Sequence, residues 1–128
     1  MHRFLRMAKS FAETYNYDSS LEYLLCALIV KGGRVLSVGY NHRGLTALQN
    51  VHRVGRKAET VHAEVHAVLQ KRDKIRFEGS KIFVVRLRAD GSLGLARPCP
   101  TCQAVLKAYG IKKAYYSISN EEYGVLLL

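Results

Sequence analysis

Residues 23–40 read YLLCALIVKGGRVLSVGY, and this stretch sets the type of fold. Tyr23 to Val30 is continuously apolar, which is typical of a strand that is buried on both faces of a sheet. Lys31 to Arg34 contains two glycines and predicts a tight turn, and Val35 to Tyr40 predicts the returning strand. A strand buried on both faces needs helices above and below it, so the sequence predicts an α/β fold.

The segments on either side of this hairpin supply the helices and further strands. Apolar residues at helical spacing predict one helix over Arg3 to Thr14 and another over Val61 to Arg72, with Thr60 as the N-cap of the second. Strand–helix–strand units make part of the sheet parallel, so we expect three α/β/α layers around a mixed sheet of about five strands. We expect one domain over residues 1–128. The other predicted elements are a strand over Lys81 to Arg88, a helix over Pro100 to Tyr109 that Gly110 ends, a strand over Lys112 to Ile118, and a strand or tail over Tyr123 to Leu128.

Composition and length exclude several classes of protein. An apolar content of 48% over 128 residues is that of a folded chain. The longest apolar run, Leu24 to Val30, is far shorter than a membrane span, and the charged start, Met1 to Arg6, does not resemble a signal peptide. Three cysteines are too few for a disulfide framework, and we expect Cys26 to be a buried apolar residue. A reducing cytoplasm, including a host cytosol for a phage-encoded chain, and no membrane partner are therefore expected.

The charge of the chain points to phosphate-bearing partners. Lysine and arginine total 20 against 10 acidic residues, which gives a net charge of +10. This excess attracts phosphate on a mononucleotide or on a polynucleotide. The basic segment Asn41 to Ala58, which has no acidic residue, is either a solvated loop or a surface that faces the substrate. It contains His42, Arg43, His52, Arg53, Arg56 and Lys57.

Two motifs far apart in the sequence carry the chemistry, His62-Ala63-Glu64 and Pro98-Cys99-Pro100-Thr101-Cys102. Imidazole and thiolate are ligands that zinc favours, and one histidine with two cysteines leaves a fourth tetrahedral position for water, as in a catalytic site. Zinc lowers the pKa of bound water to about 7, and Glu64 is then available to move protons. Both motifs stand where helices are predicted to begin, and a helix N-terminus favours the thiolate that binds metal.

Other interpretations of these residues are open but less specific. Cys99 and Cys102 have the spacing of a redox pair, but no thioredoxin-like pattern surrounds them. His62 and His66 are four residues apart on one helix, yet the metalloprotease motif needs Glu where Ala63 stands, so we expect His66 to lie behind the ligands or in the core. A structural zinc site lacks an evident fourth ligand. His42 and His52 leave open an accessory metal site.

On these motifs and this order of elements, the chain resembles the zinc-dependent cytidine and deoxycytidylate deaminase superfamily, including its phage-like nucleotide deaminases. The resemblance extends from Tyr23 to Ser117. It implies a cytidine-deaminase-like fold, Zn²⁺ on His62, Cys99 and Cys102, and Glu64 as the general acid and base of a hydrolytic deamination. It also implies a homo-oligomer, in which the apolar stretch Val125 to Leu128 is a candidate contact.

The resemblance also suggests substrate contacts. Asn41, after Gly39 and Tyr40, stands where the family contacts the sugar, although Asn at the end of a strand is as often a turn residue. Ala63 is expected to pack beside the base and Pro98 to shape the pocket wall. Because arginine binds phosphate in a bidentate manner, the basic segment is expected to hold a phosphate. Its candidate residues are Arg43, Arg53, Arg56 and Lys57.

The chain departs from the family pattern in two places. Members that act on free nucleotides often read His-Ala-Glu-x-Asn-Ala, whereas His66 stands here in place of that Asn. Residues Ala89 to Ala96 add a turn before Pro98, where in many deoxycytidylate deaminases the strand leads almost directly to the cysteines. The contact that the Asn makes in those members is therefore not carried over to this chain.

These observations favour one function over two others. The leading hypothesis is hydrolytic deamination of cytosine in a deoxycytidine nucleoside or nucleotide, above all deoxycytidine monophosphate, by zinc-activated hydroxide with Glu64 as proton shuttle. The second is deamination of cytosine or adenine in single-stranded DNA or tRNA, which fits the basic charge but finds no stacking aromatic residue between Asn41 and Ala58. The third is a non-catalytic, zinc-stabilised nucleic-acid-binding module, which has no need of Glu64. The aromatic candidates for stacking elsewhere are Tyr115, Tyr116 and Tyr123.

Overall fold

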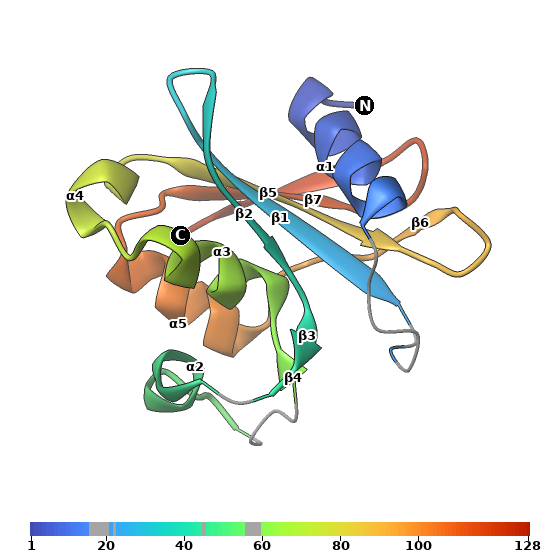
Figure 1. Ribbon diagram of the computed structural model, residues 1–128. Coiled ribbons are helices and arrows are strands. Elements are labelled where there is room, and N and C mark those ends of the chain that lie inside the picture. The colour runs from blue at the N-terminus through green and yellow to red at the C-terminus, as the bar shows by residue number, and fades with distance from the viewer. Residues whose placement is uncertain (16–20, 22, 45, 56–59) are drawn as a thin grey trace.

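The computed structural model places a mixed sheet between helices on both faces (Figure 1). It describes residues 1–15, 21, 23–44, 46–55 and 60–128. In this part of the chain the six-stranded sheet has the order β2-β1-β5-β7-β8, with β6 paired to the end of β5. Strands β5 and β7 are parallel and the other pairs are antiparallel, which confirms the predicted mixed sheet. The strands are β1 (Leu24–Lys31), β2 (Arg34–Tyr40), β5 (Lys81–Leu87), β6 (Leu93–Gly94), β7 (Lys113–Ser117) and β8 (Tyr123–Leu127).

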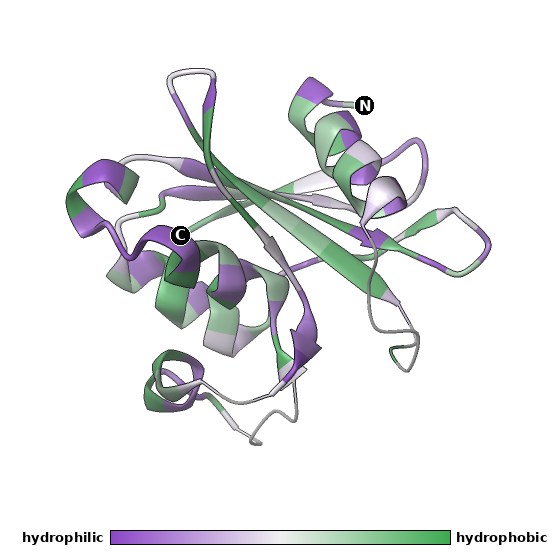
Figure 2. Ribbon diagram, viewed as in Figure 1, coloured by the Kyte–Doolittle hydropathy of each residue, from purple (hydrophilic) through white to green (hydrophobic). Residues whose placement is uncertain are grey.

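Strand β1 is apolar from Leu24 to Val30 because its two faces belong to two different cores. Cys26 and Leu28 face α1 (Arg3–Thr14) in one cluster, and Ala27 and Ile29 belong to the other cluster. That second cluster lies under α3 (Ala63–Lys71) and α5 (Pro100–Ala108). Figure 2 shows β1 coloured as hydrophobic along most of its length. The predicted three layers are thus confirmed, and Cys26 is fully buried as expected.

The basic segment contains structure that the sequence did not predict. Strand β3 (His42–Arg43) pairs with β4 (Thr60–Val61), and a short helix α2 (Ala47–Val51) lies between them. Arg56 and Lys57 lie outside the described residues. A further short helix, α4 (Lys74–Phe77), follows α3, and Asp73 caps it by accepting a hydrogen bond from the backbone of Arg76. Among the described residues, no helix is both long enough and apolar enough to cross a membrane.

Two predicted features need correction. Helix α3 begins at Ala63 rather than at Val61, because Thr60 and Val61 are held extended by pairing with β3. His62 is consequently the N-cap of α3 and Thr60 is not. Residues Tyr123–Leu127, for which a strand or a tail was predicted, form the edge strand β8.

A close approach between backbones fixes α3 against β2. A Cβ atom on Gly39 would collide with the carbonyl oxygen of Ala63 and the amide nitrogen of Ala67. The hydroxyl of Ser37, also on β2, donates a hydrogen bond to the carbonyl of Ala67. Since α3 carries the first motif at its start, this contact also sets the position of Glu64.

Candidate functional site

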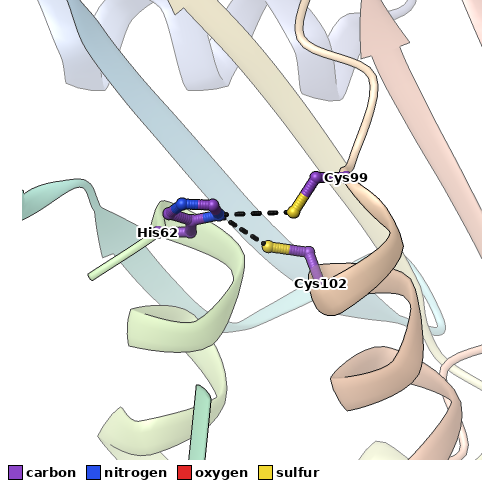
Figure 3. A group of neighbouring side chains, drawn as sticks. All are labelled: His62, Cys99 and Cys102. Carbon is purple, nitrogen blue, oxygen red and sulfur yellow. Dashed lines mark hydrogen bonds between the residues drawn. The ribbon is translucent and has the colours of Figure 1, made fainter. Parts of the chain in front are cut away.

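Three potential metal ligands meet where α3 and α5 begin. His62 is the N-cap of α3, Cys99 is the N-cap of α5, and Cys102 lies in the first turn of α5. The His62 Nδ1 atom lies 3.2 Å from the Cys102 Sγ atom and 3.5 Å from the Cys99 Sγ atom (Figure 3). In a tetrahedral zinc site with bonds near 2.0 and 2.3 Å, nitrogen and sulfur ligands lie about 3.5 Å apart. The donor set and its spacing therefore fit Zn²⁺.

The charges of these groups favour an anionic sulfur. Hydrogen bonds from Cys102 and His62 hold the pKa of the Cys99 thiol at about 4, against the opposing effect of burial. The hydrogen bond with Cys99 raises the pKa of His62, and the hydrogen bond with Cys99 together with burial raises the pKa of Cys102. The cluster thus combines a thiolate with protonated neighbours, and a metal ion binding there displaces those protons.

Glu64 lies beside this ligand group, in the first turn of α3. Its side chain is only 4% exposed, and burial raises the pKa of its carboxyl. A buried carboxyl of this kind keeps a proton that an exposed glutamate loses, which is the property of a general acid.

A cavity of about 210 Å³ connects Glu64 with the ends of several strands. It includes two of the three potential ligands, His62 and Cys99. The start of β1 and the end of β5 form the opposite side, so groups from distant parts of the sequence meet here. The lining residues are Tyr23, Leu25, Asn41, Thr60, His62, Glu64, Arg86, Leu95, Ala96, Arg97 and Cys99.

A second cavity, of about 270 Å³, touches His62 and Cys99 from the side of α2. Arg53 and Thr101 line it, but Glu64 does not. Proton transfer needs a carboxyl within reach of the reacting group, so the cavity that contains Glu64 is the candidate active site.

Of the predicted substrate contacts Asn41, Ala63 and Pro98, only Asn41 lines the Glu64 cavity. Asn41 lines it, but its Oδ1 atom accepts a hydrogen bond of 2.7 Å from the Leu25 amide and its Nδ2 atom donates one of 3.2 Å to the Tyr23 carbonyl. Asn41 therefore ties the end of β2 to the start of β1 as well as facing the cavity. Ala63 and Pro98 are buried and are not lining residues.

Arg43 and Arg53, the described arginines of the basic segment, do not line the Glu64 cavity. Arg43 is exposed on β3, and Arg53 lines the second cavity instead. The two arginines that do line the Glu64 cavity are Arg86 and Arg97, which sequence reasoning missed. A single arginine at the end of an apolar strand gives no signal of its own in the sequence.

Gln49 is a positioning residue that sequence reasoning also missed. Its side chain is 5% exposed, donates a hydrogen bond of 2.8 Å to the Thr60 carbonyl, and accepts one of 2.9 Å from the His62 amide. Helix α2 thereby fixes the backbone at which β4 ends and α3 begins. The signal for this role is only a polar residue in a short helix, which is common in solvated loops.

The remaining histidines lie apart from the ligand group. His66 accepts a hydrogen bond of 2.9 Å from the Tyr40 amide at its Nδ1 atom, and it is not part of the ligand group. His42 contacts the His66 ring at a centroid distance of 4.7 Å, and the Nδ1 atom of His52 lies 3.0 Å from the Leu48 carbonyl. Within the described residues, one group of three or more metal-binding side chains occurs, and it excludes His42 and His52.

Comparison with known proteins agrees with this geometry. Residues 1–118 match the family model of the cytidine and deoxycytidylate deaminase zinc-binding region. Cytidine deaminase from Burkholderia pseudomallei has a similar structure, with a TM-score of 0.67 and 18% identity over 99% of this chain and 92% of that chain. The dCMP deaminase of cyanophage S-TIM5 has a TM-score of 0.57 and 22% identity over 90% and 79% of the two chains. A search of curated proteins found no significant match.

Proposed function

Because the chain belongs to the cytidine and deoxycytidylate deaminase family, we propose that it hydrolyses the exocyclic amine of cytosine in deoxycytidine monophosphate or a related deoxycytidine nucleotide. The observation that carries this proposal is the place of Glu64, a buried carboxyl that lines one cavity with His62 and Cys99. The cyanophage S-TIM5 protein has been crystallised with dCMP and dUMP, which are the substrate and product classes proposed here.

Each residue of the candidate site has a separate task in this reaction. His62, Cys99 and Cys102 would hold zinc, which lowers the pKa of water to about 7 and so supplies a nucleophile at neutral pH. Glu64 would carry protons from water to the ring nitrogen and to the departing amine. The overall reaction adds one water to the base and releases one ammonia, and Glu64 ends it in its initial protonation state.

The rest of the cavity would orient the base and limit its contact with bulk water. Leu25 and Ala96 give apolar surface in the lining, and Thr60 and Asn41 give polar groups. An apolar wall with a few fixed polar groups is typical of a small-molecule site.

The two other classes of function have less support. Two of the three tyrosines considered for base stacking are used in packing, since Tyr115 stacks on Phe83 at 4.7 Å and Tyr116 is 9% exposed, while Tyr123 is 40% exposed. No observation on the described residues favours single-stranded nucleic acid as the partner. A non-catalytic zinc module gains nothing from burying Glu64, because an unneeded buried carboxyl only costs free energy.

Assembly and location belong to the same proposal. We propose one domain over residues 1–128 that acts in a reducing cytoplasm as a homo-oligomer. The edge strand β8 exposes Val125 by 48% and Leu127 by 72%, which is apolar surface available for a contact between subunits.

The test is ammonia release by zinc-loaded protein from deoxycytidine monophosphate, deoxycytidine and a cytosine-containing single-stranded oligonucleotide. Wild type is compared with Glu64→Gln at equal zinc content. We expect turnover of the monophosphate above the other two substrates, and its loss in Glu64→Gln. Turnover of the oligonucleotide alone would overturn the proposed substrate, and no turnover of any substrate by zinc-loaded wild type would overturn the proposed activity.

A further inference from the structure

Arg86 is the one cationic side chain from the middle of the sheet that lines the Glu64 cavity among the described residues. Resting on the proposed function, we infer that Arg86, assisted by Arg97, binds the phosphate of the substrate and makes the enzyme select a nucleotide over a nucleoside. Arg43 and Arg53, which the sequence suggested for this task, do not line this cavity.

The strand register directs Arg86 toward the site. Side chains alternate along a strand, so Arg86 shares a face with Ile82 and Val84, and both of these belong to the core beneath α3 and α5. The Arg86 amide donates a hydrogen bond of 3.2 Å to the Ser117 hydroxyl, which anchors the backbone at this point. The α3 and α5 side of the sheet is the side on which His62 and Glu64 lie.

The guanidinium of Arg86 contacts the Tyr23 ring but keeps a hydrogen-bond donor available among the described residues. Its Cζ atom lies 4.0 Å from the centre of the Tyr23 ring, a cation–π contact that fixes the plane of the group. Its Nε atom is buried and has no hydrogen-bond partner among the residues that the structure describes. A buried donor without a partner is costly, and an anionic ligand in the cavity would satisfy it.

The segment between β5 and Cys99 builds the wall next to Arg86. Strand β7 pairs with β5 only as far as Val84, and β6 pairs with Arg86 and Leu87 beyond that point. The chain then passes Leu95 and Arg97, which line the cavity, before it reaches Cys99. The segment Ala89 to Ala96 therefore contains β6, which pairs with Arg86, and it leads directly to Arg97.

Arg97 adds a second positive charge on this side. Its Nη1 atom donates a hydrogen bond of 3.1 Å to the Tyr116 hydroxyl, and its Cζ atom lies 5.7 Å from the centre of that ring. Among the residues that the structure describes, Glu64 is the only acidic one in the cavity lining, and it lies beside the ligands His62 and Cys99. The base would therefore lie near Glu64 and an anion near the arginines.

A phosphate monoester is the ligand that this pair of arginines fits. The planar guanidinium offers parallel donors to two phosphate oxygens, and a terminal phosphate carries more charge than the diester inside a polynucleotide. A cavity of about 210 Å³ also suits one nucleotide better than a strand that must enter and leave.

The experiment compares Arg86→Gln with wild type on deoxycytidine monophosphate and deoxycytidine. We expect the KM for the monophosphate to rise about 10- to 100-fold with little change in kcat, since a hydrogen bond to a charged group is lost. The ratio of kcat/KM for monophosphate over nucleoside should fall by the same factor. Arg86→Lys keeps the positive charge but loses the two parallel donors of the guanidinium. It should therefore recover part of the kcat/KM ratio of monophosphate over nucleoside.

Arg88→Gln is the matched control, because Arg88 is an exposed arginine just after β5 that does not line the cavity. It should leave the ratio unchanged. An equal loss on both substrates in Arg86→Gln, or no loss on either, would overturn the inference, because a structural role or no role would then explain Arg86. A loss confined to a single-stranded oligonucleotide would also overturn it, since the phosphate would then be that of a polynucleotide.

Binding measurements separate this inference from the proposed function. If zinc-loaded wild type turns over neither substrate, calorimetric titration of the Glu64→Gln protein with monophosphate and nucleoside still measures the phosphate preference. The double variant that carries both Glu64→Gln and Arg86→Gln should bind the monophosphate no better than the nucleoside. A preference for the monophosphate that persists in this variant contradicts the inference. If Arg86→Gln does not fold, as judged by thermal melting, Arg86→Lys and Arg97→Gln provide the same comparison.

Discussion

The two sides of the cavity differ in how the chain assembles them. On the zinc side, His62, Glu64 and Cys99 stand at or next to the starts of helices, within short motifs. On the other side, Tyr23 and Arg86 come together because β1 and β5 pair in one particular register, with Leu25 opposite Arg86. The chemistry of the first side can be inferred from neighbours in the sequence, whereas the specificity that we propose for the second side depends on long-range pairing.

Loss of a zinc ligand should produce the largest effect and confirm which side carries the chemistry. Cys99→Ala removes the group that is held as a thiolate. Substitution of a residue that only hydrogen-bonds to a ligand lowers metal affinity about 10- to 100-fold, so we expect the loss of zinc affinity here to exceed about 100-fold. Activity should fall with zinc content, measured by elemental analysis. Cys26→Ala is the control, because Cys26 is buried on the opposite face of the sheet and should keep its zinc. Full zinc content in Cys99→Ala would contradict the assignment.

Glu64→Gln should separate proton transfer from metal binding on the same side. An amide keeps the size of the side chain but cannot carry the proton, so kcat should fall by about 10²- to 10⁴-fold. Zinc content and thermal stability should stay close to those of the wild type. A variant that lost zinc as well would show that Glu64 belongs to the ligand set instead.

Gly39→Ala tests how the zinc side depends on the sheet. The added methyl group would press on the backbone of α3 at Ala63 and Ala67, and overpacking of this kind lowers the free energy of unfolding by about 1–3 kcal/mol. Urea denaturation measures the change, and activity should fall because α3 carries His62 and Glu64. An unchanged free energy of unfolding in Gly39→Ala would show that the contact with α3 is unimportant.

The smallest expected effect concerns His66, which lies on α3 four residues after the ligand His62. Burial and the neighbouring His42, the titratable group that faces it, lower the pKa of His66. The fold therefore favours the neutral imidazole, and this stability is complete above the unfolded pKa of about 6.5 and is lost as the pH falls below it. His66→Asn should flatten the dependence of unfolding free energy on pH between neutral and acidic conditions. If the dependence of unfolding free energy on pH is unchanged in His66→Asn, protonation of His66 does not contribute to it.

Elements in which apolar residues repeat regularly were predicted well, whereas short strands that form only by pairing with a distant segment were not. Strand β1 and helix α1 were predicted because apolar residues repeat along them. The pairing of β3 with β4 involves only two residues on each strand, which is too short for any period, and it moved the start of α3 from Val61 to Ala63.

The same division applies to the candidate site. The ligand group His62, Cys99 and Cys102 was predicted from chemistry and spacing, and the structure brings it together. Gln49 and Arg86 were missed because a buried glutamine or an arginine at a strand end acquires its role only through the residue placed opposite it. The basic charge of Asn41 to Ala58 suggested a phosphate site, but net charge alone does not tell which arginine lines a cavity.

The most direct test of the account is conversion of deoxycytidine monophosphate by zinc-loaded protein in water enriched in oxygen-18. Mass spectrometry of the product and an ammonia assay follow both halves of the reaction together. The account predicts deoxyuridine monophosphate with one labelled oxygen on the base and one ammonia released for each product molecule. Recovery of unchanged substrate from zinc-loaded protein, or release of free cytosine, would contradict it.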